Sequence, residues 1–208
     1  MKFDSPFAFE QRYDLRRQLW LDGPHSGWLA LDRILEREVV VNWPYRSDDD
    51  PQFLQMVQVR SLLRHANLVP LYDLGISSTG KPFFTEPYLI ATDLWRLQHS
   101  AEEKASEVTL PCLVSYLLDV CRAIAFLHGQ GYIHLELNPR NVLVLPETQE
   151  VFLIRGHHSL PPVTLERVCS AKGPNGVILG AAGYLAPEQL DPERLGAADV
   201  VTDVYGLG

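Results

Sequence analysis

The chain has 208 residues, of which 46% are hydrophobic and 21% charged, a composition that favours a globular domain with a buried core over a disordered chain. Its formal net charge of −8 argues against a surface for nucleic acid or anionic membranes, because an acidic protein repels phosphate groups. We therefore expect neither nucleic acid nor a membrane among its partners.

The cysteine pattern and the apolar segments indicate a cytoplasmic location. The three cysteines have no paired spacing, which fits reduced thiols better than a disulfide or zinc framework. No run approaches the roughly 18 consecutive apolar residues of a membrane span, and residues 1–18 contain no signal-peptide core.

The first ninety residues predict mostly strands with one helix. A β-branched run over residues 39–41, which ends at Asn42, is typical of a short strand. Acidic residues and a proline precede an apolar pattern over residues 53–64, which predicts a helix. Residues 75–81 then predict a hairpin-like turn that leads into a strand at residues 82–85.

The second half of the chain has a more helical pattern. Apolar residues at three- and four-residue spacing predict a helix over residues 113–127. Two short strands follow at residues 142–144 and 151–154, and a long loop containing glycine and proline spans residues 156–183. With a hinge near residues 86–92, this order predicts an α+β protein.

Five segments carry motifs in a fixed order. Residues 134–141 read H-L-E-L-N-P-R-N, residues 186–188 read A-P-E, and residues 203–208 read D-V-Y-G-L-G. Upstream, residues 37–42 read R-E-V-V-V-N and residues 65–69 read H-A-N-L-V. Together these segments resemble the protein kinase catalytic domain, and they are most similar to bacterial serine/threonine kinases of the eukaryotic type.

The resemblance implies a bilobal kinase-like fold in one domain, with a strand-rich N-lobe over residues 1–87 and a helical C-lobe over residues 88–208. The C-lobe would lack its final helices, because the sequence stops where the central helix of that lobe begins. We expect apolar faces of the 113–127 helix and the 203–208 segment to be exposed unless another polypeptide completes the lobe.

The resemblance also implies that the phosphate-binding residues have been replaced. The glycine-rich loop falls on residues 20–25, where Trp20 stands at a glycine position. Asn42 stands where the kinase has its strand lysine, and Met56 stands where it has the helix glutamate that pairs with that lysine. Since both charges are gone, we expect a packing contact in place of the ion pair.

The adenine pocket is altered in the same register. Val40 replaces the small alanine of its roof, and Leu143 keeps an apolar floor. Glu86 takes the gatekeeper position, and Leu89 lies in the hinge. A carboxylate at Glu86 would be costly to bury without a partner.

The catalytic loop and the metal site are partly replaced. Glu136 stands for the aspartate base, Asn138 for the lysine that touches the transferred phosphate, and Leu135 for an arginine. Asn141 is retained and could offer an oxygen to a metal ion. Arg155 occupies the position of the metal-binding aspartate and would repel Mg²⁺.

Three functions remain open at this point. The first is a pseudokinase that needs neither ATP nor Mg²⁺ and acts by binding proteins, for example through residues 159–180. Its partner would be another kinase or a chain that completes the C-lobe. The second is a divergent serine/threonine kinase that uses ATP and Mg²⁺ with Glu136 and Asn141. The third is a truncated product without a function of its own.

Overall fold

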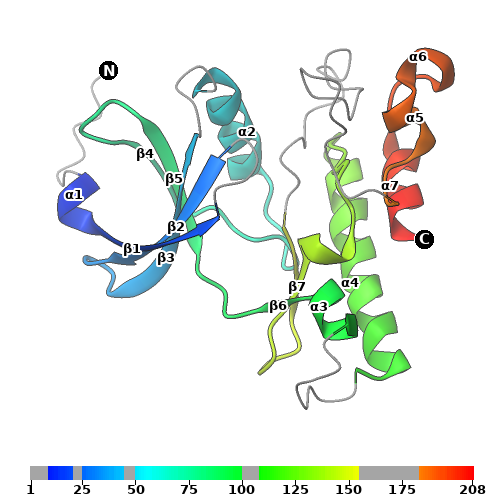
Figure 1. The fold of residues 1–208 in the computed structure, drawn as a ribbon, viewed down its shortest axis with the longest axis horizontal. Helices are drawn as coiled ribbons and strands as arrows, with labels where there is room; N and C mark the ends of the chain where they lie inside the picture. Colours follow the sequence, from blue (N-terminus) through cyan, green and yellow to red (C-terminus); the bar gives the residue numbers. More distant parts are fainter. Residues whose placement is uncertain (1–8, 21–24, 45–49, 100–107, 155–182) are drawn as a thin grey trace. The chain divides into compact units, whose positions relative to one another are not determined.

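The computed structural model describes residues 9–20, 25–44, 50–99, 108–154 and 183–208 (Figure 1). The chain divides into two compact units, and each is described by itself. The first contains residues 1–62 and 70–89, and the second contains residues 63–69 and 90–208. The segment 63–69 thus belongs with the second unit although it follows a helix of the first.

The described part of the first unit is a five-stranded antiparallel sheet with two helices (Figure 1). The strand order is β1-β2-β3-β5-β4, so β3 is central. The elements are α1 (Phe9–Arg12), β1 (Tyr13–Trp20), β2 (His25–Asp32), β3 (Arg37–Pro44), α2 (Asp50–Leu62), β4 (Asp73–Ile76) and β5 (Pro82–Pro87).

Alternation along β3 and β5 gives the sheet two buried faces. Val39, Val41 and Phe83 pack with residues of α1 and β1 in one cluster. Their neighbour Phe84 packs instead with Met56 and other residues of α2. Because successive side chains of a strand point to opposite faces, the even-numbered positions of β3 and β5 lie on the α2 face.

The predicted elements of this unit are found with one error. The strand at 39–41 is confirmed as part of β3, and the helix predicted at 53–64 is confirmed as α2, which ends at Leu62. The prediction that Gly75 begins a turn is wrong, because Gly75 lies within β4, opposite Phe83. A Cβ at this glycine would lie 2.6 Å from the Phe83 ring, so its absence allows the close approach of the two strands.

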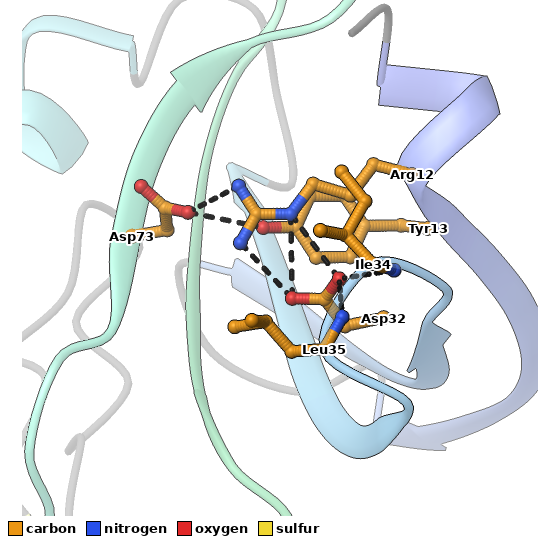
Figure 2. Close-up of polar contacts among 6 residues, drawn as sticks. All are labelled: Arg12, Tyr13, Asp32, Ile34, Leu35 and Asp73. Atoms are coloured by element: carbon orange, nitrogen blue, oxygen red, sulfur yellow. Dashed lines mark hydrogen bonds and ion pairs between the residues drawn. The ribbon is translucent and has the colours of Figure 1, made fainter.

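A partly buried charge cluster joins the start of β1 to the rest of the sheet (Figure 2). The Arg12 guanidinium lies between two carboxylates, at 3.0 Å from Asp32 and 2.6 Å from Asp73. Asp32 also accepts hydrogen bonds from the N–H groups of Ile34 and Leu35 in the β2–β3 turn. Tyr13 donates to Asp73, and burial raises the pKa of Tyr13 to about 12.

This cluster makes the free energy of unfolding depend on pH in the acid range. Burial opposes the ionisation of Asp32, but hydrogen bonds from Arg12, Leu35 and Ile34 outweigh it and hold the pKa of this carboxyl below its ordinary value. The stabilisation is therefore complete above the unfolded pKa of about 3.9 and is lost as the pH falls through the lower folded pKa.

We expect Asp32→Asn to lower the free energy of unfolding most at neutral pH, with the difference from the original protein narrowing as the pH falls below about 4. Urea denaturation between pH 3 and pH 7 measures this difference. Asp14→Asn is the control, because the Asp14–Arg33 pair is exposed and such pairs contribute little. A difference for Asp32→Asn that stayed constant over the pH range would contradict this assignment.

The described part of the second unit contains a small antiparallel sheet and the longest described helix, α4. Its strand order is β6-β7-β8. The elements are β6 (Thr92–Asp93), α3 (Leu94–His99), α4 (Leu110–Gly129), η2 (Pro139–Asn141), β7 (Val142–Val144), β8 (Val151–Leu153), α5 (Pro187–Leu190), α6 (Pro192–Leu195) and α7 (Val200–Leu207). The predictions of a helix at 113–127 and of strands near 142–144 and 151–154 are confirmed.

Helix α4 has one buried stripe and one exposed apolar stripe. The buried side chains recur at three- and four-residue spacing: Tyr116, Val120, Ala123, Ile124 and Leu127. Leu110, Val114 and Leu118 are exposed, as are Val201 and Val204 of α7, which meets the expectation of exposed apolar surface. By length and composition alone α4, with mean hydropathy 1.8, could cross a membrane, but a helix of a protein core meets the same criterion.

Candidate functional site

A buried hydrogen-bonded triad occupies the α2 face of the sheet. Glu86 at the end of β5 accepts a hydrogen bond from Asn42 Nδ2 of β3 at 3.1 Å through Oε1. Its Oε2 is paired with Arg60 Nη2 of α2 at 2.6 Å. The side chains of Arg60 and Glu86 are only 8% and 12% exposed, so the ion pair is shielded from water. The Arg60 guanidinium also lies 4.7 Å from the centre of the Phe84 ring.

The triad corrects the expectation of a packing contact between Asn42 and Met56. Met56 packs with Phe53, Val57 and Phe84, while Asn42 binds Glu86. An ion pair between helix and sheet does exist, but its polarity is reversed. The helix supplies the cation and the sheet supplies the anion, so the buried carboxylate at Glu86 has its partner.

A tryptophan fills the space beside Gly27. Trp20 at the end of β1 lies opposite Gly27 in β2. A Cβ at Gly27 would lie 2.1 Å from the Trp20 indole, so any larger residue at position 27 would clash with it. The position of the Trp20 indole therefore requires a glycine at position 27. Residues 21–24, the remainder of the glycine-rich loop position, lie outside the described residues.

The residues predicted for the adenine pocket are described in each unit by itself. Val40 is 4% exposed on β3, opposite Glu86 in the register. Leu89 is half-buried after β5, and Leu143 is half-buried on β7 of the second unit, opposite Phe152. Val40 and Glu86 are thus brought together on one face of the sheet.

In the second unit, Asp203 fixes the start of the catalytic-loop segment. Its carboxylate accepts the N–H groups of His134 and Leu135, each at 2.8 Å. It also contacts His128 Nε2 of α4 at 2.7 Å. Leu135 has φ +70°, in the left-handed region, and this turn directs two successive N–H groups to one anion. Leu135 itself is buried with Ile133 and Ala198.

The buried His134 side chain makes hydrogen bonds with both of its ring nitrogens. Its Nε2 lies 2.8 Å from the carbonyl oxygen of Ile154, and its Nδ1 accepts from the N–H of Glu136. A carbonyl can only accept and an N–H can only donate, so the proton resides on Nε2. His134 is fully buried and holds the loop against the end of β8.

The carbonyl oxygen of Glu136 accepts hydrogen bonds from both asparagines of the loop. Asn138 Nδ2 donates to it at 3.0 Å, and Asn141 Nδ2 donates to it at 2.7 Å. Asn138 Oδ1 in turn accepts from the N–H of Arg140 and caps the turn η2. The three predicted catalytic positions Glu136, Asn138 and Asn141 therefore lie together in one hydrogen-bonded loop.

Among the described residues, Asn141 is the predicted Mg²⁺ ligand, and alone it does not complete a Mg²⁺ site of the kinase type. Asn141 offers a single amide oxygen, whereas Mg²⁺ prefers carboxylates in near-octahedral coordination. Within the described ranges no three His, Cys, Asp or Glu side chains gather in a group that could hold a metal. The predicted replacement of the metal-binding aspartate, Arg155, and the segment 159–180 lie outside the described residues.

Residues 35–154 match the family described as protein tyrosine and serine/threonine kinase. The chain belongs to this family. The match covers more than half of the sequence and includes both the Asn42–Glu86–Arg60 triad and the loop from His134 to Asn141.

Bacterial serine/threonine kinases are among the relatives of this kinase-family chain. The DNA damage-responsive serine/threonine-protein kinase RqkA of Deinococcus radiodurans is 32% identical over 95% of the chain and 28% of the relative. The serine/threonine-protein kinase PknB of Mycolicibacterium smegmatis is 28% identical over 98% of the chain and 32% of the relative. The chain thus spans about a third or less of the length of these relatives.

A solved structure confirms the kinase-like fold. The crystal structure of the Mycobacterium tuberculosis PknI kinase domain matches with a TM-score of 0.64 and 19% identity, covering 100% of this chain and 73% of that one. The predicted α+β kinase-like fold is therefore correct.

Two residues at these sites were missed by sequence reasoning. Arg60 follows Met56 by one helical turn, so both lie on the sheet-facing side of α2, and this spacing could have identified it. His128 belongs to no motif that the sequence analysis used, and its contact with Asp203 joins residues that are 75 positions apart.

Proposed function

We propose that this kinase-family chain acts as a pseudokinase, which binds other proteins and transfers little or no phosphate. The observation that carries the proposal is the triad of Asn42, Glu86 and Arg60. A kinase holds the ATP phosphates with a strand lysine, but here the strand residue is a neutral amide that donates to a carboxylate. The nearby cation is already neutralised by that carboxylate.

Two further observations support the proposal. The Trp20 indole fills the space beside Gly27, and by the family resemblance Trp20 stands at a glycine position of the phosphate-binding loop. Asn141 alone does not supply the ligands that Mg²⁺ prefers. The loop around His134 is nevertheless held by hydrogen bonds to Asp203, Ile154 and Asn141, which supports a retained scaffold beside replaced nucleotide contacts. We further propose a cytoplasmic protein that requires neither ATP nor Mg²⁺ and has a protein as its partner.

ATP is expected to leave the protein's thermal stability unchanged. A ligand present at 100 times its Kd stabilises the native state by about 2.7 kcal/mol, which for 150–250 residues raises Tm by roughly 5–10 °C. We expect a shift of less than about 1 °C at 1 mM ATP, with or without Mg²⁺ or Mn²⁺. Differential scanning fluorimetry measures it.

Phosphate transfer is tested separately with ATP labelled in the γ-phosphate. The original protein and Glu136→Ala are incubated with Mg²⁺ or Mn²⁺ and a generic protein substrate, and the incorporated label is counted. We expect equal, background incorporation in both. Robust transfer that disappears in Glu136→Ala would overturn the proposal and favour the divergent active kinase.

A further inference from the structure

The strand β4 forms one edge of the five-stranded sheet (Figure 1). It pairs with β5 in a regular register from Asp73 to Ile76 and, within the described ranges, with no other strand. Every second residue of an edge strand directs its backbone N–H and C=O groups away from the one neighbouring strand. The outer side of β4 can therefore pair with a further strand.

Two large apolar side chains of β4 are exposed beside this edge. Leu74 is 45% exposed and Ile76 is 70% exposed. They lie two positions apart and so point to the same face of the sheet, where Leu74 is opposite Phe84. Phe84 is fully buried against α2, whereas the two side chains of β4 are left uncovered. The apolar α2 face of the sheet thus continues to the edge as an exposed strip, formed by Leu74 and Ile76.

The opposite edge of the same sheet has two features that oppose pairing with another strand. Strand β1 exposes Arg16 and Arg17, and charged side chains protect an edge because pairing would remove them from water. Its register with β2 also shifts at two points, and such irregularities twist an edge away from a partner. From Asp73 to Ile76, by contrast, β4 has a regular register and no arginine or lysine.

The charges near β4 are of both signs. Asp73 lies on the face away from the strip, where it pairs with Arg12 at 2.6 Å. Glu10 of α1 accepts a hydrogen bond from a serine of the β4–β5 turn, and Lys81 is exposed at the end of that turn. Arg37 stacks on a tyrosine ring just before β4. A partner would therefore bind through backbone and apolar contacts, and a neutral segment is neither attracted nor repelled by the net charge of −8.

We propose that the outer edge of β4 docks a short extended segment of a partner protein, with apolar side chains at every second position. The segment would pair with β4 through main-chain hydrogen bonds, and its apolar side chains would cover Leu74 and Ile76. The strip exposes roughly 200 Å², well below the ~800 Å² that each partner contributes to a stable interface between folded proteins. Because β4 is also only four residues long, it suits a short segment better than a second copy of the chain.

This inference names the partner chemistry of the proposed protein-binding role and rests on that role. The two can fail separately, since ATP assays test the loss of phosphate transfer and peptide binding tests the edge of β4.

The test is fluorescence anisotropy with the full chain and a short peptide of alternating threonine and valine, labelled with an uncharged fluorophore. We expect saturable binding that Ile76→Lys weakens by about 10-fold, because it removes an apolar contact and places a charge on the edge. Leu74→Lys should act in the same direction. Leu15→Lys is the matched control and should bind like the original, because Leu15 is similarly exposed, at 40%, on the opposite edge strand β1.

Several results would overturn the proposal. They are absence of saturable peptide binding, equal affinity in Ile76→Lys and the original protein, or equal binding of the same peptide with every backbone amide N-methylated, which cannot donate to β4. A dimer in analytical ultracentrifugation that Ile76→Lys abolishes would assign the edge to a second copy of the chain instead. Thermal melting of each variant confirms that a weaker affinity does not come from unfolding.

Discussion

Replacing Arg60 with methionine is expected to lower the free energy of unfolding by about 3–5 kcal/mol. The substitution keeps the length and apolar stem of the side chain but leaves the Glu86 carboxylate without its 2.6 Å partner. Removing one member of a buried ion pair is costly because the remaining carboxylate stays shielded from water and keeps only the hydrogen bond from Asn42, with no opposite charge. Urea denaturation at neutral pH measures the loss.

The double variant Arg60→Met, Glu86→Gln is the control for that result. The introduced glutamine is neutral and keeps an oxygen that can accept from Asn42 Nδ2, so we expect the second substitution to recover most of the lost stability. Recovery in the double variant would identify the unpaired charge, not lost packing, as the cause. If Arg60→Met cost less than about 1 kcal/mol, the buried triad would not describe the protein in solution.

Replacing Asp203 with alanine is expected to cost about 2–6 kcal/mol, because the N–H groups of His134 and Leu135 would each lose their acceptor. Each unsatisfied buried donor costs about 1–3 kcal/mol. The left-handed turn at Leu135 also depends on this anion, since two adjacent N–H groups point to it. Thermal and urea denaturation both report the effect.

Asp203→Asn separates hydrogen bonding from charge. Asparagine keeps one acceptor oxygen, so we expect a loss smaller than that of alanine. His128→Ala, which leaves both N–H bonds to Asp203 in place, should cost less than Asp203→Ala. Equal losses in all three variants would show that the region tolerates no substitution and that the acceptor role of Asp203 is not the cause.

Predictions from local patterns succeeded where neighbours in sequence decide the structure. The spacing of Val120, Ile124 and Leu127 within α4 is a property of the helix itself, so the helix was predictable before its packing was known. The order of the motifs from Arg37 to Gly208 was likewise enough to predict the kinase-like fold. The assignment of Gly75 to a turn failed because the decisive contact, with the Phe83 ring, comes from another strand.

The sequence by itself determined the fold class, and it predicted that kinase residues are replaced at Asn42, Glu86 and Glu136. Only the tertiary structure decided what the replacements do. Glu86 meets Asn42 across 44 positions and Arg60 across 26, distances at which no periodicity links residues. The cost of burying a carboxylate could be foreseen, since it depends on residue type. Its partner could not, because that depends on how helix α2 packs against the sheet.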